Sequence, residues 1–138
     1  MSEQFLLACH EIVEFCKKHR GKCFAGWSDE ILLRYVAFHA FCGTLFLVRV
    51  NDKITAIAVA QPMSEAQLSE PFAWQKTDGD CILFHELIGS RREFKTLFCA
   101  ALNRFPQVKR YFGQRFKGGE SPVLLEFKPP FLERFAHV

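Results

Sequence analysis

The stretch 80-DCILFHELIGSRREFKTLFCAALNRF-105 decides the fold. Residues 81–88 form a short apolar run that only His85 and Glu86 interrupt, and Gly89 ends it too soon for a helix. This pattern predicts a central strand. Beyond it the apolar residues recur with helical spacing, at Phe94, Leu97, Phe98, Ala101, Leu102 and Phe105. They predict an amphipathic helix over 91–105 that ends near Pro106.

The turn between strand and helix, Gly89 to Arg92, is the first candidate binding site. Ser90 with Glu93 three residues later fits a capping box, which predicts the start of the helix. Arg91 and Arg92 then lie in the first turn, where the helix dipole disfavours cations. A bound anion such as a phosphate would reverse that penalty, because backbone N–H groups and guanidinium groups converge there. The alternative is two solvated arginines that tolerate a small penalty.

Two helices are predicted before the first strand. Ser2 can cap the first, which Gly21 ends, and the basic run at 17–20 lies in its last turn. That run suits the helix dipole, although nucleic acid binding is an alternative. The second helix begins at Ser28 and ends at Gly43. His39 lies on its apolar side, which is typical of a hydrogen-bonded core histidine rather than a ligand.

The remaining elements are predicted from β-rich runs and turn residues. Residues 44–50 and 54–61 flank Asn51-Asp52-Lys53, which indicates a β-hairpin. The polar segment 62–79 has Ser64 to cap a short helix and Pro71 to break it. Strands are expected at 108–116 and 123–127. The short crossover predicts that 81–88 and 108–116 pair in parallel, within an α+β domain (1–138) whose mixed sheet is mostly antiparallel.

Composition restricts the class of protein. With 138 residues, of which 49% are apolar, the chain suits one domain with a full core. Its six cysteines contain no C-x-x-C pair, so reduced thiols are expected and no metal is predicted. No apolar run is long enough to span a membrane and no signal peptide is recognisable. These features predict a cytoplasmic protein without membrane partners.

The order of elements resembles the GNAT acyltransferase fold. Over about residues 45–127 the chain is also similar to the bacterial toxin-activating lysine acyltransferases, a GNAT-like family. The similarity rests on three collinear stretches, LFLVRVNDKITAIAVAQPMS, TDGDCILFHELI and NRFPQVKRYFGQR. The resemblance implies a catalytic acid at Glu86 and a second catalytic residue at His19, which a basic residue follows. It also implies an acyl-thioester donor, either acyl-CoA or acyl carrier protein.

Acyl transfer to an amine needs a base that removes a proton from the attacking nitrogen. Glu86 is the first candidate, since burial between apolar neighbours should raise its pKa. The alternative is a structural ion pair of Glu86 with an arginine. Strand alternation places His85 on the opposite face, where it is a lesser catalytic candidate. Gly89, Ser90, Arg91 and Arg92 would bind the donor, although this turn lacks the second small residue of the usual coenzyme A motif.

The second function hypothesis is a GNAT-like module without catalysis. Between residues 91 and 138 there are ten basic and four acidic residues, so a basic region could bind a partner. The partners considered are an acyl carrier protein, a protein substrate, a second copy of the chain in a homodimer, and nucleic acid. Arg110, Tyr111, Phe112, Arg115 and Phe116 interleave cations with aromatic rings as RNA-binding proteins do. A half-buried strand gives the same alternation.

Overall fold

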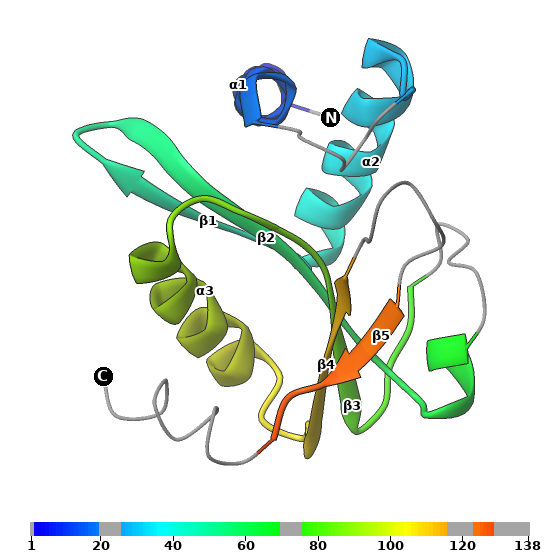
Figure 1. Cartoon of the computed structure of the whole chain (residues 1–138). Helices are drawn as coiled ribbons and strands as arrows, with labels where there is room; N and C mark the ends of the chain where they lie inside the picture. The colour runs from blue at the N-terminus through cyan, green and yellow to red at the C-terminus, as the bar shows by residue number, and fades with distance from the viewer. Residues whose placement is uncertain (1, 20–25, 70–75, 116–122, 129–138) are drawn as a thin grey trace.

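A computed structural model describes residues 2–19, 26–69, 76–115 and 123–128. Its elements are α1 (Glu3–His19), α2 (Asp29–Cys42), β1 (Leu45–Val50), β2 (Lys53–Met63), the 3-10 helix η1 (Ala66–Ser69), β3 (Cys81–Ile88), α3 (Arg91–Arg104), β4 (Arg110–Arg115) and β5 (Val123–Glu126). In Figure 1, α1 and α2 lie on one side of the sheet and α3 lies on the other. The predicted α+β class is confirmed.

The strands form one sheet in the order β1-β2-β3-β4-β5. All neighbours pair antiparallel except β3 and β4, which run parallel with Cys81 opposite Arg110 and Phe84 opposite Gly113. The predicted strand 81–88 and its parallel pairing with the strand after the helix are therefore confirmed. The mixed, mostly antiparallel sheet follows from this single parallel pair.

Local side chains fix where the first two helices begin. The Ser2 hydroxyl accepts a hydrogen bond from the Phe5 backbone N–H at 3.1 Å, and Ser28 caps α2 through the Ile31 N–H at 3.2 Å. Gly43 ends α2 in the left-handed conformation, with φ of 73°. These predicted boundaries are confirmed, whereas the predicted end of the first helix at Gly21 lies outside the described residues.

The β1–β2 hairpin turns at Asn51 and Asp52, which have positive φ values of 53° and 63°. Two successive left-handed residues match the twist of the flanking strands, and asparagine and aspartate tolerate that conformation. The predicted hairpin is confirmed, and β2 runs on to Met63. Ser64 accepts a bond from the Gln67 N–H at 3.4 Å at the start of η1, while Pro71 lies outside the described residues.

The capping box predicted for α3 is only partly correct. The helix begins at Arg91 as expected, but the Ser90 side chain caps no backbone N–H. Its hydroxyl donates to Glu93 Oε1 at 2.6 Å, which is a charge-assisted hydrogen bond. Hydrogen bonds from the hydroxyls of Ser90 and Thr55, and from the Ser90 backbone N–H, lower the pKa of Glu93.

A β-bulge in β3 overturns one prediction. Val59 of β2 lies opposite Glu86, whereas the next residue, Ala60, lies opposite Phe84, so His85 is an extra residue in β3. Val59 packs in the core beneath α1 and α2, and the His85 ring lies 5.9 Å from that of His39 in α2. Both His85 and Glu86 therefore face α1 and α2. The expectation that they point to opposite faces is wrong, because the inserted residue breaks the alternation.

The buried apolar residues form three clusters, and the two that pack beneath the helices lie on opposite faces of the sheet and differ in character. Beneath α1 and α2 the core contains Cys9, Cys16, Leu32 and Val36 with Ile57, Val59 and Ile88 of the sheet. On the other face the small residues Ala56, Ala58 and Ala60 let α3 pack closely. The five cysteines within the described ranges form no disulfide, as predicted, and Cys23 lies outside those ranges.

Replacing Gly89 with alanine is expected to destabilise the protein by about 2–4 kcal/mol. Gly89 has a φ of 142°, and a Cβ there would lie 2.5 Å from the Cβ of Ala56 and 3.0 Å from the carbonyl oxygen of Thr55. Urea unfolding measures the change. Gly26→Ala is the matched control, since Gly26 also has a positive φ of 79° but has nothing within 4 Å of the added Cβ. Equal losses in the two variants would contradict the steric argument.

Candidate active site

Glu86, the predicted base, lies in β3 where the strand faces α1. Its side chain is half-buried and its Oε2 atom is buried. Cys16 of α1 is fully buried nearby. Burial raises the pKa of the Cys16 thiol to about 12, and the negative charge of Glu86 adds to the rise. Glu86 is thus a half-buried carboxylate at the boundary between the sheet and α1, whereas the apolar strand predicted a buried one.

His85 is 8% exposed and is held by a short hydrogen-bonded chain. Its Nε2 lies 2.7 Å from Gln61 Oε1, and because that oxygen accepts, Nε2 carries the proton. Gln61 Nε2 donates to the Thr77 hydroxyl at 3.3 Å, which donates to the Pro62 carbonyl at 2.7 Å. Burial, helped by the charge of His39, lowers the pKa of His85 to about 3. His85 is therefore neutral near pH 7.

His39 is buried between α2 and the sheet. Its Nδ1 lies 2.7 Å from the Thr44 hydroxyl oxygen, and that hydroxyl donates to the His39 carbonyl at 3.2 Å. The ring also stacks edge-on against Tyr35, with centroids 4.5 Å apart. Burial lowers the pKa of His39 to about 4. The expected hydrogen-bonded core histidine is confirmed.

His19, the second catalytic residue implied by the resemblance, lies at the exposed end of α1. It is one helical turn beyond Cys16, and its ring packs against Phe15 with centroids 4.6 Å apart. The basic residue after it, Arg20, lies outside the described residues. The structure thus places His19 at the surface, on the same helix as Cys16, which lies near Glu86.

The turn predicted to bind an anion borders a pocket of about 550 Å³. Ser90, Arg92, Glu93 and Thr96 from the start of α3 line it together with Val48, Val50 and Thr55 of the hairpin. The exposed Arg92 supplies a cation, whereas Glu93 supplies a carboxylate that already accepts from Ser90. Arg91 occupies the first helical position, and its side chain lies outside the described part of the chain. The structure therefore brings Ser90 and Arg92 into one pocket.

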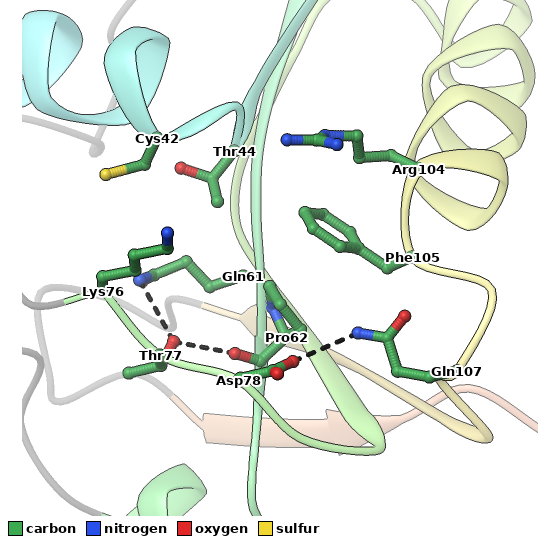
Figure 2. Close-up of a pocket in the computed structure, with 10 residues that line it drawn as sticks. All are labelled: Cys42, Thr44, Gln61, Pro62, Lys76, Thr77, Asp78, Arg104, Phe105 and Gln107. Atoms are coloured by element: carbon green, nitrogen blue, oxygen red, sulfur yellow. Dashed lines mark hydrogen bonds between the residues drawn. The ribbon is translucent and has the colours of Figure 1, made fainter.

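A second pocket, of about 300 Å³, lies at the other end of the sheet and could not be predicted from the sequence (Figure 2). Thr44, Gln61, Lys76, Thr77 and Arg104 contribute polar groups to it. They come from segments far apart in the chain, so no motif connects them. The one sequence signal is Gln61, a buried polar residue near the end of the apolar strand β2.

No family model, no curated protein and no solved structure matches the chain. The resemblance to toxin-activating acyltransferases stays a prediction. Among the described residues, no three metal-ligating side chains cluster together, and no helix is both long and apolar enough to cross a membrane.

The polar groups on the sheet have different chemical capacities. Glu86 can accept a proton on the face of β3 that α1 covers, while His85 is held neutral by burial and by Gln61. The pKa of Cys16 is raised too far for a thiolate to form near pH 7. Of these three groups, Glu86 is therefore the one suited to act as a base.

Proposed function

We propose that the protein is a GNAT-like acyltransferase, which moves an acyl group from a thioester donor to an amine. The donor would be acyl-CoA or an acyl carrier protein. The observation that carries the proposal is the position of Glu86. It stands in β3 beyond the last residue that pairs with β4, and three residues before the turn that leads into α3.

The edge of β3 offers a place for the donor. β3 and β4 pair only over Cys81 to Phe84, opposite Arg110 to Gly113, and β3 then continues to Ile88. Within the described ranges, no strand pairs with residues 86–88 on the β4 side. A pantetheine arm carries amide groups, so it could hydrogen-bond to this edge as an added strand does. Its phosphate end would then reach the start of α3, where Ser90 and Arg92 lie.

Each residue then has a defined role. Glu86 would take a proton from the acceptor ammonium, and the freed amine would attack the thioester carbonyl carbon. The carbon–sulfur bond would break and the thiolate would leave and take up a proton. His85 cannot supply that proton near pH 7, because its pKa is lowered to about 3. His85 therefore has no proton-transfer role in this scheme, and His19 stays a catalytic candidate implied only by the resemblance.

The test is acyl transfer from a panel of acyl-CoA and acyl carrier protein donors. Glu86→Gln is expected to lower the turnover by about 100-fold or more, since it removes the base but keeps the shape. Arg92→Gln is expected to weaken donor binding with a smaller effect on turnover. His10→Gln, on the exposed side of α1, is the control and should leave both unchanged. No transfer with any donor, or full activity in Glu86→Gln, would exclude the proposal.

A second candidate is a binding module without catalysis. The bond from Ser90 to Glu93 favours it, because an internal carboxylate already occupies part of the turn proposed for the donor. Part of the basic C-terminal region that would bind a partner already forms ion pairs within the fold. Arg110 pairs with Glu126 at 3.0 Å and with Glu65 at 3.1 Å. Arg110 also lies over the ring of Phe112, 5.1 Å from its centroid. These contacts favour a protein partner over nucleic acid.

A further inference from the structure

The 300 Å³ pocket lies at an open edge of β2. β1 begins at Leu45 opposite Val59, and the Ala60 N–H donates to the Thr44 carbonyl at 2.9 Å. Beyond that point β2 continues to Met63, past the first residue of β1. The end of α2 borders the pocket on one side and the end of α3 borders it on the other, as Figure 2 shows. The pocket is far along the sheet from the turn at Gly89, which follows the opposite end of β3.

Two cations and one carboxylate, which already accepts hydrogen bonds from neighbouring residues, set the charge of the pocket. In Figure 2 the guanidinium group of Arg104 extends from α3 toward Thr44, and Lys76 enters from the other side. Asp78 Oδ1 accepts from the Gly79 N–H at 2.8 Å and from Gln107 Nε2 at 3.2 Å. In the described part of the chain, neither Lys76 nor Arg104 forms an ion pair. The pocket therefore has a positive charge available for a ligand.

Buried groups hold the neutral lining residues in place. Gln61 is 3% exposed and Thr44 is 6% exposed. Gln61 accepts from His85 and donates to Thr77, and the Thr44 hydroxyl bonds to the ring and the carbonyl of His39. Such a second layer fixes the direction of polar groups before a ligand arrives. This lining is a preorganised set of polar groups rather than a loose surface.

We infer that this pocket binds a small organic anion. Its carboxylate or phosphate group would contact Arg104 and Lys76, and its remaining part would lie against Phe105 and Pro62. A volume of about 300 Å³ is at the lower limit for small-molecule sites, so the ligand is compact. The two cations would repel an amine, which makes this a site separate from that of the proposed acyl acceptor. The inference does not depend on acyl transfer.

The test is calorimetric titration of the whole chain with malonate, succinate, inorganic phosphate and glycerol phosphate near pH 7. We expect at least one of them to bind saturably at a single site. Lys76→Gln with Arg104→Gln should weaken that binding by about tenfold or more, whereas Arg92→Gln, which removes a cation from the other pocket, should not. Binding should also shift the NMR signals of the Gln61 side-chain amide and of His85.

The outcomes decide the proposal in both directions. Preference for the dicarboxylates or for the phosphates identifies the anionic group. Absence of binding by all four probes overturns the inference, and so does binding that survives the double substitution or that Arg92→Gln weakens equally. Both altered side chains are exposed, so the variants should fold, and thermal unfolding verifies this. If the double variant unfolds, each single substitution is read by the same criteria. Loss of acyl transfer with retained anion binding would refute only the proposed function.

Discussion

The free energy of unfolding is expected to fall by about 4 kcal/mol between pH 7 and pH 5, about 2 kcal/mol for each of His39 and His85. Burial lowers their pKa values to about 4 and about 3, below the ordinary 6.5. As the pH falls below 6.5, the unfolded chain takes up protons that the folded protein excludes. Stability is therefore complete above pH 6.5 and is lost as the pH approaches the folded-state values.

Urea unfolding at pH 7, 6 and 5 measures this dependence. The double variant His39→Gln with His85→Gln should show a much smaller change in the free energy of unfolding between pH 7 and pH 5, even if it is less stable at pH 7. His10→Gln is the matched control, because it makes the same substitution at an exposed position on α1. The range stops at pH 5 because Glu93 and Glu126, whose pKa values are lowered by their hydrogen bonds, contribute at lower pH. A stability that is constant from pH 7 to pH 5 would contradict the burial of neutral histidines.

Phe84→Ala is expected to destabilise the protein by about 3–5 kcal/mol. Phe84 is 1% exposed at the centre of the core beneath α3. Its ring centroid lies 4.4 Å from that of Phe98 and 6.3 Å from that of Phe127. Truncation would leave a cavity among rings that α3 and the sheet hold in place. The lost stability therefore includes both the hydrophobic burial of the removed ring and the cost of the cavity.

Phe41→Ala provides the control for Phe84→Ala with the same chemical change. Phe41 is 82% exposed, so its truncation should alter the free energy of unfolding by less than about 0.5 kcal/mol. Chemical denaturation at pH 7 compares the two variants with the parent. A loss below about 2 kcal/mol for Phe84→Ala would show that the core around α3 relaxes to fill the space, against the close packing described.

Most elements could be predicted because their causes are local. The 3.6-residue spacing from Phe94 to Phe105 and the short apolar run before Gly89 each determine one element without help from the rest of the chain. The hairpin at Asn51 has its own turn residues. Short connections then limit the sheet to few arrangements, which is why the parallel pairing of β3 with β4 was accessible from sequence.

The faces of β3 could not be predicted, because a bulge is a property of a pair of strands. Nothing in the sequence around His85 shows that β2 will skip a residue opposite it. The bulge therefore moved His85, predicted on the opposite face, to the same face as Glu86. Likewise, the Ser90 side chain had two acceptable partners, and the folded backbone selected the Glu93 carboxylate. The pocket around Arg104 and Gln61 exists only once distant segments meet.

The division of the sheet into two cores has a consequence for cooperativity. Protonation acts on the side where α1 and α2 cover His39 and His85, whereas the side beneath α3 has no buried histidine within the described residues. Acid thus weakens one layer of helices while the aromatic packing of the other persists. Unfolding by acid can then pass through a partly folded state in which β2, β3 and α3 remain together, and probes of the two layers would report different midpoints.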